Sequence, residues 1–117
     1  MRRRHLTILF SDLSDSTRLA DAMEAEDYAD LLGRLRRAYQ EVIPKHGGTI
    51  VRIQGDGLLA IFGYPDAGEN DGRRATETAL QLHAVVREFP FERPLPGARL
   101  GLHSGIHAGL VLLDEGD

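Results

Sequence analysis

The sequence predicts an α+β domain with a ferredoxin-like split βαβ sheet and its helices on one face of that sheet. Short β-rich runs and longer runs of helical periodicity follow one another in the order β, α, α, β, β, α, β. Two of the β-rich runs are joined by a short glycine-containing turn, which indicates an antiparallel hairpin. This order matches a split βαβ unit, and 117 residues suit one domain with one core.

The first half of the chain contains one predicted strand and two predicted helices. The run His5–Phe10 is compact, β-rich and bounded by polar residues, which is typical of a buried strand. Ser14–Thr17 offers several helix-capping residues, so a short helix is predicted from there toward Met23. Apolar residues then recur at helical spacing and predict a helix from about Asp27 to Ile43, which Pro44 ends.

The second half contains a hairpin, a helix and a last strand. Thr49–Gln54 and Leu58–Phe62 are β-rich runs separated by Gly55–Gly57, so we expect a hairpin with an acidic tip. Apolar residues trace one face of a third helix over 71–89. Arg99–Leu113 has apolar residues among glycines, which indicates a strand that bends and continues.

Composition excludes several functional classes. The net charge of -4 gives no reason to expect binding to nucleic acid, and the absence of cysteine excludes disulfides and thiolate metal sites. The apolar run after Met1–Arg4 is too short for a signal peptide, and no stretch approaches the roughly 20 apolar residues of a membrane span. The chain is therefore expected to be soluble and cytoplasmic, with no membrane contact of its own.

Two aspartates stand at positions that chemistry can use. Asp12 follows the first predicted strand and Asp56 lies at the predicted hairpin tip, and strands of one sheet can bring them together. Two adjacent carboxylates repel unless a cation intervenes, and hard oxygen ligands favour Mg²⁺ or Mn²⁺. The alternative is structural, with Asp12 as a helix cap and Asp56 as a turn former. Spacing alone leaves both interpretations open.

Three motifs resemble class III adenylyl and guanylyl cyclases. Phe10–Thr17 resembles the first metal motif of that family, Gly47-Gly48 through Arg52–Gly57 the second, and Arg99–Gly105 the strand-four motif. They occur in the family's order and cover nearly all of the chain. The resemblance implies that residues 1–117 are part of a class III nucleotidyl cyclase catalytic domain with a truncated nucleotide cyclase fold.

The resemblance also implies site residues. It places Asp12 and Asp56 on the catalytic, metal-binding aspartates and Leu13 on a position whose carbonyl contacts a metal. It places Ser14, Asp15, Ser16 and Thr17 on a phosphate-binding turn, Arg99 on the triphosphate-binding arginine and Arg52 on a purine-reading lysine. Backbone N–H groups at a helix start and a guanidinium both suit phosphate, although Arg99 also fits a solvated strand arginine.

The implied activity is conversion of ATP or GTP to a 3′,5′-cyclic nucleotide and pyrophosphate, with two Mg²⁺ or Mn²⁺ ions per site in a homodimer. ATP is favoured over GTP, although arginine in place of lysine at position 52 leaves base selection open. The family's transition-state Asn and Arg follow the fourth strand, so this chain alone is expected to be inactive. The alternatives are a non-catalytic cyclase-homology regulatory module and a diguanylate cyclase, whose Gly-Gly-acidic hairpin differs from Gly55–Gly57.

Other polar residues receive no role from the sequence. His103 and His107 flank a glycine-rich bend and are interpreted as packing or surface groups. The helical arginines are interpreted as solvated helix faces, and they are Arg34, Arg36, Arg37, Arg73 and Arg74.

Overall fold

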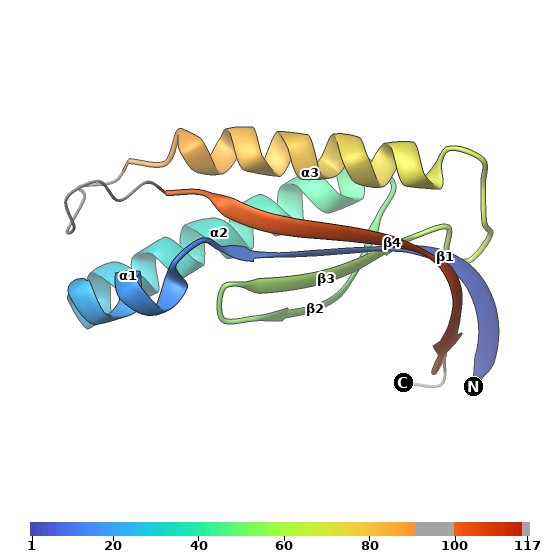
Figure 1. Cartoon of the computed structure of the whole chain (residues 1–117), viewed down its shortest axis with the longest axis horizontal. Coiled ribbons are helices and arrows are strands. Elements are labelled where there is room, and N and C mark those ends of the chain that lie inside the picture. Colours follow the sequence, from blue (N-terminus) through green and yellow to red (C-terminus); the bar gives the residue numbers. More distant parts are fainter. Residues whose placement is uncertain (91–99, 116–117) are drawn as a thin grey trace.

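A computed structural model describes residues 1–90 and 100–115 of the chain. Its seven elements follow the predicted order β, α, α, β, β, α, β (Figure 1). They are β1 (Arg2–Leu13), α1 (Ser16–Ala22), α2 (Ala25–Lys45), β2 (Thr49–Gln54), β3 (Gly57–Phe62), α3 (Asp71–Arg87) and β4 (Leu102–Leu113).

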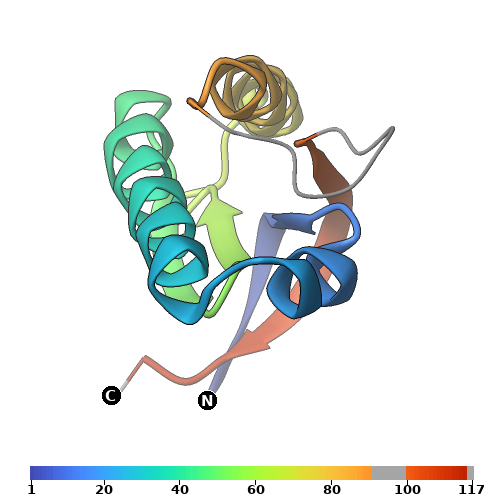
Figure 2. The same ribbon diagram turned by 90° about the vertical axis from the view of Figure 1, so that its left-hand side faces the viewer.

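The four strands form one sheet in the order β2-β3-β1-β4, and every neighbouring pair is antiparallel. Because β1 and β2 are both antiparallel to β3, they run in the same direction with β3 between them. This is the split βαβ arrangement, so the predicted fold class is confirmed. Helices α2 and α3 lie on the same side of the sheet, and α1 lies at the end of the domain where the β2–β3 hairpin turns (Figures 1 and 2).

Strand β1 is longer at both ends than the apolar run predicted. It pairs with β4 along its whole length, from Arg2 opposite Leu113 to Leu13 opposite Leu102, whereas β3 pairs only with residues 7–11. Its length is therefore set by β4, a partner that is far away in the sequence. The two strands curl away from the rest of the sheet together, so that the start of β1 lies beside the end of β4 (Figure 1).

The core lies between the helices and one face of the sheet. Along β1, Leu9, Ser11 and Leu13 are buried on the helix side, whereas Phe10 and Asp12 alternate with them and face the open side. Helix α2 contributes Tyr39, which is fully buried, among other core residues. Asp12 is therefore presented on the uncovered face of a sheet whose other face is packed.

Two further findings concern the predicted boundaries. The third helix ends at Arg87, and α2 runs through Pro44 to Lys45 instead of ending before it. The predicted start of the last strand at Arg99 lies outside the described residues, and β4 is described from Leu102. Among the described residues, none of the helices combines the length and the hydrophobicity of a membrane span.

Candidate active site

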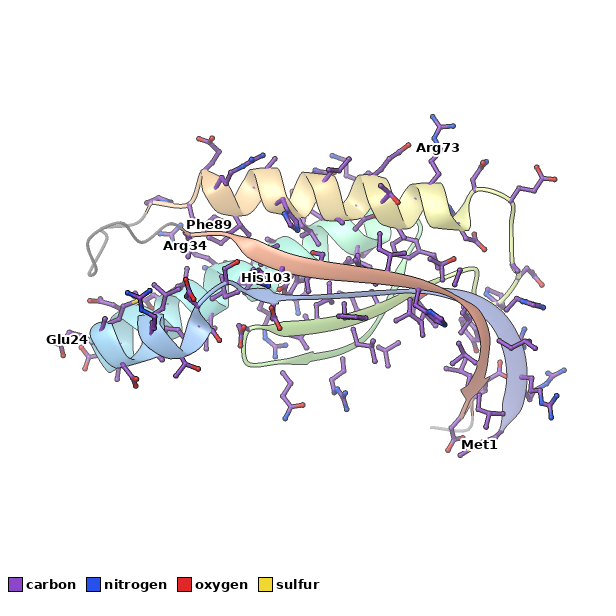
Figure 3. The ribbon with its side chains drawn as sticks, viewed as in Figure 1. Met1, Glu24, Arg34, Arg73, Phe89 and His103 are labelled. Carbon is purple, nitrogen blue, oxygen red and sulfur yellow. The ribbon has the colours of Figure 1, made fainter. Side chains whose placement is uncertain are left out.

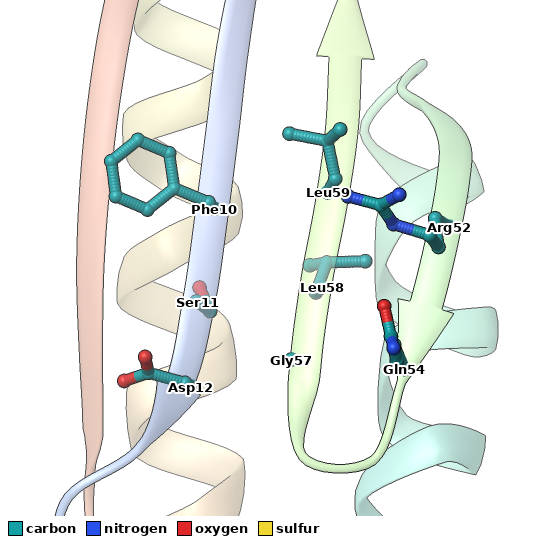
Figure 4. Close-up of a pocket in the computed structure, with 8 residues that line it drawn as sticks. All are labelled: Phe10, Ser11, Asp12, Arg52, Gln54, Gly57, Leu58 and Leu59. Atoms are coloured by element: carbon teal, nitrogen blue, oxygen red, sulfur yellow. The ribbon is translucent and has the colours of Figure 1, made fainter.

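A hollow of about 280 Å³ opens on the uncovered face of the sheet beside β1. Phe10 and Asp12 line it from β1 with their side chains directed toward β4, and Arg52 extends from β2 across toward β3 (Figure 4). Successive side chains of a strand point to opposite faces of the sheet. Phe10 and Asp12 are two positions apart on β1, and Arg52 and Gln54 are two positions apart on β2, so each pair lies on one face. Its full lining is Phe10, Ser11, Asp12, Arg52, Gln54, Gly57, Leu58 and Leu59.

Asp12 is a strand residue and not a helix cap. It lies inside β1, opposite His103 of β4, and α1 begins only at Ser16 with Asp15 at the N-cap position. In residues 1–90 and 100–115, no hydrogen bond or ion pair engages the Asp12 side chain. The capping alternative is therefore wrong for Asp12, and its carboxylate is available to a ligand on the open face.

Asp56 does occupy a tight turn, but its carboxylate reaches another strand. The turn between β2 and β3 consists of Gly55, at a φ of 59°, and Asp56. The Leu13 backbone N–H donates a 2.9 Å hydrogen bond to Asp56 Oδ2. The hairpin thus places Asp56 against the end of β1, one residue after Asp12, so the structure brings together the two aspartates that the sequence singled out.

Burial and the charge of this site raise the pKa of two tyrosines of α2. Burial raises the pKa of the Tyr39 hydroxyl, and the carboxylates of Asp56 and Asp12 raise this pKa further. Burial also raises the pKa of Tyr28, and the charge of Asp56 adds to that effect. The negative charge of both aspartates therefore acts on one buried group, the Tyr39 hydroxyl.

The predicted phosphate turn lies directly after β1. The Ser14 backbone N–H donates to the Gly101 carbonyl at 2.9 Å, and Asp15 adopts the left-handed conformation with a φ of 55°. Ser16 and Thr17 form the first positions of α1, which has no side-chain cap hydrogen bond. The turn therefore leads from Asp12 to the start of a short helix. Arg99, also predicted to bind phosphate, lies outside the described residues.

The hollow contains residues that sequence reasoning missed. Phe10 is 53% exposed, an unusual position for a phenylalanine in a central strand, and Gln54 and Leu59 lie beside Arg52. The signal for Phe10 and Gln54 was present, because they lie two positions from Asp12 and Arg52 on the same strands. Leu59 required the pairing of β3 with β2, which places it opposite Arg52.

The donor set fits a hard divalent cation. In the described residues, no three Asp, Glu, His or Cys side chains are grouped closely enough to hold a metal ion. The available donors are the carboxylates of Asp12 and Asp56 and the backbone carbonyl of Leu13. Mg²⁺ is commonly held by one or two carboxylates together with substrate phosphates and water. A donor set of this size leaves coordination positions for phosphate oxygens and water.

One of the arginines interpreted as solvated has a structural role. Arg74 is half-buried and forms an ion pair with Asp71, whose other carboxylate oxygen accepts a 2.7 Å hydrogen bond from the Gly68 backbone. Arg73, in contrast, points away from the sheet into solvent (Figure 3). The helical periodicity did not reveal this difference because Asp71 becomes buried only by the loop before α3.

This fold and this site define a class of protein. The chain belongs to the adenylate and guanylate cyclase catalytic domain family, whose sequence profile matches residues 1–115. It is 26% identical over 108 residues to adenylate cyclase 1 of Rhizobium meliloti (strain 1021), covering 88% of this chain and 16% of that protein. It is 29% identical over 110 residues to the receptor-type guanylate cyclase gcy-23 of Caenorhabditis elegans, covering 90% of this chain and 10% of that protein.

Solved structures show the same fold. The guanylyl cyclase Cya2 is 29% identical, with a TM-score of 0.80 over 99% of this chain and 61% of that one. The guanylate cyclase domain of RhGC from Catenaria anguillulae, solved with GTP, is 21% identical, with a TM-score of 0.81 over all of this chain and 65% of that one. The chain thus spans less than two thirds of these domains and only a small part of the curated relatives.

Proposed function

We propose that the chain contributes the metal and phosphate half of a nucleotidyl cyclase site that converts ATP or GTP to a 3′,5′-cyclic nucleotide and pyrophosphate. The observation that carries this proposal is the hydrogen bond from the Leu13 N–H to Asp56 Oδ2. It draws the hairpin carboxylate to the strand end that bears Asp12, beside a hollow also lined by Arg52. Membership of the cyclase family supports the same reaction.

In this proposal, Asp12 and Asp56 hold two Mg²⁺ or Mn²⁺ ions together with the carbonyl of Leu13. Such ions, when bound, favour the ionised ribose 3′-hydroxyl and neutralise phosphate charge. The reaction forms a bond between O3′ and the α-phosphorus and breaks the bond from that phosphorus to the leaving pyrophosphate. The turn Ser14–Thr17 holds phosphate oxygens through the backbone N–H groups that follow Ser14, whose own N–H donates to the Gly101 carbonyl, because the start of a helix favours negative charge.

The base and the partner are also part of the proposal. Arg52 offers its donors to a purine, and because the site of this family is shared across a dimer, it serves the site of the partner subunit. We propose ATP as the preferred substrate over GTP and a homodimer as the working form. Arg99 binds the triphosphate, and the chain alone forms no product, because the transition-state Asn and Arg of the family lie after the fourth strand.

The test is a cyclase assay on the complete protein that carries this chain, with Mn²⁺ and either ATP or GTP. Asp12→Asn and Asp56→Asn are each expected to lower turnover by about 10² or more, because metal-centred charge stabilisation is lost. Asp21→Asn, at an exposed aspartate of α1, is the matched control and should retain activity. Turnover within tenfold of the wild type in either site variant would contradict the metal assignment.

A parent protein that forms no cyclic product with either nucleotide, while remaining folded, would favour the regulatory cyclase-homology module instead. Circular dichroism of each variant checks that the fold is retained.

A further inference from the structure

Tyr39 connects the core to the candidate site. Its side chain is fully buried on α2, yet its hydroxyl donates a 2.9 Å hydrogen bond to the backbone carbonyl of Asp56. A buried hydroxyl needs a partner, because leaving it unpaired costs more than the bond itself contributes. A phenylalanine would fill the same space without that requirement. The polar contact of this core residue is therefore made with the turn that carries a candidate metal ligand.

The turn is held at two points. Tyr39 binds the Asp56 carbonyl, and the Asp56 carboxylate accepts from the Leu13 N–H at 2.9 Å. Within residues 1–90 and 100–115, these are the two hydrogen bonds that tie Asp56 to elements outside its own hairpin. Helix α2, the β2–β3 turn and the end of β1 are thereby linked through one residue.

We infer that Tyr39 is a positioning residue that fixes the hairpin tip and keeps the Asp56 carboxylate beside Leu13 and Asp12. It acts through Asp56 and touches no reacting atom. Tyr39→Phe retains the ring and removes only the hydroxyl, so it separates this role from core packing. The part of the inference that concerns metal binding rests on the proposed function, whereas the part that concerns the position of Asp56 does not.

Tyr28 provides a matched control. It lies on the same helix and is close enough for the charge of Asp56 to raise the pKa of its hydroxyl. Its hydroxyl makes no hydrogen bond to any of the described residues. Tyr28→Phe therefore removes the same atom near the same carboxylate without releasing the turn.

The first measurement is amide hydrogen exchange of Leu13 in the metal-free chain. Loss of one hydrogen bond corresponds to a change of about threefold to tenfold in an equilibrium. Tyr39→Phe is expected to accelerate exchange at Leu13 by about that factor, with amides in the middle of β1 and β3 unchanged and Tyr28→Phe like the wild type. Unchanged exchange at Leu13, or equal acceleration in both variants, would overturn the inference.

The second measurement is Mn²⁺ binding, followed by the electron paramagnetic resonance signal of the free ion with a non-hydrolysable ATP analogue present. Tyr39→Phe is expected to weaken binding about threefold to tenfold, Tyr28→Phe to leave it unchanged, and Asp56→Asn to weaken it far more. If Asp56→Asn loses Mn²⁺ binding but Tyr39→Phe does not alter it, the role of Tyr39 in metal binding is overturned. The role of Tyr39 in positioning Asp56 is then decided by exchange at Leu13. Binding that Asp56→Asn does not weaken overturns the metal assignment itself, and exchange at Leu13 still decides whether Tyr39 positions Asp56.

Discussion

At the residue scale, the chemistry of the candidate site depends on which face of a strand each side chain takes. Ser11 and Asp12 are neighbours in β1, yet Ser11 is buried and hydrogen-bonded to Ser104 at 2.7 Å, whereas Asp12 faces the open side. Asp56 does not follow this alternation because it lies in a turn. Hydrogen bonds from the Leu13 N–H and the Tyr39 hydroxyl set its position. The two aspartates therefore come to lie at the same end of β1 by different structural means.

The Tyr39 hydroxyl makes the free energy of unfolding depend on pH in the alkaline range. Burial and the nearby carboxylates raise its pKa in the folded chain above the usual value of about 10. Ionisation therefore favours the unfolded chain, and stability from this group is complete below about pH 10 and is lost as pH rises above it. We expect the free energy of unfolding of the wild type to exceed that of Tyr39→Phe by about 1 kcal/mol near pH 8, and this difference to shrink above about pH 10.

Urea unfolding of both proteins between pH 8 and 10.5 measures this difference. Curves that stay parallel over the whole range would show that Tyr39 ionises equally easily in the folded and unfolded chains.

Much of the candidate site was predictable from single residues, and the rest depended on contacts between distant segments. Asp12 and Asp56 were chosen from motif and position, and the structure places them together. Phe10 and Leu59 were missed because their exposure is decided by the open face of the sheet, which no single strand reveals. Tyr39 lies in the helix predicted from about Asp27 to Ile43, but its polar contact was missed because the partner of its hydroxyl is 17 positions away in the sequence.

At the scale of elements, all seven helices and strands were predicted in the right order, because each carries its own periodicity and its own end signals. The bounds of β1 were not predicted correctly. Its first residues, Arg2, Arg3 and Arg4, have no apolar pattern and form a strand because β4 pairs with them. The end of α2 was set two residues early because Pro44 was expected to end the helix, whereas the backbone N–H groups of residues 46–48 donate to the carbonyls of Ile43 and Pro44 and close the last turn beyond it.

The passage from α2 to β2 depends on a close approach at Gly48. A Cβ at this position would lie 2.7 Å from the ring of Phe62 and 2.9 Å from Ile43, and both of these side chains are fully buried. Because neither can move aside, Gly48→Ala is expected to destabilise the fold by about 1 to 3 kcal/mol. Thermal or urea unfolding measures the change.

Gly72→Ala is the matched control for this substitution. Gly72 lies near the start of α3 with open space around the added Cβ, so alanine there should leave stability equal or raise it by about 0.5 to 1 kcal/mol. Equal effects of the two alanines would mean that the contact at Gly48 does not constrain the fold.

At the scale of the whole molecule, β4 is one of the two edge strands of the sheet. In the described part of the chain it pairs only with β1, so it forms an edge of the sheet. Ile106, Leu110 and Leu112 project from it and are 41%, 59% and 64% exposed. A long edge strand with exposed apolar side chains is a template for pairing with another chain. The homodimer expected from the cyclase resemblance and this exposed edge both favour self-association.

We therefore expect the purified 117-residue chain to associate with rising concentration, and the double variant Leu110→Lys with Leu112→Lys to shift it toward monomer. The two lysines remove apolar surface from β4 and place like charges along its edge, which opposes pairing between copies. Leu80→Lys is the matched control, because Leu80 is 65% exposed but belongs to α3 and not to the edge strand. Sedimentation velocity at several concentrations gives the molecular mass of each protein. A wild-type chain that stays monomeric at all concentrations, or a Leu80 variant that dissociates as readily as the double variant, would show that the β4 edge does not drive association.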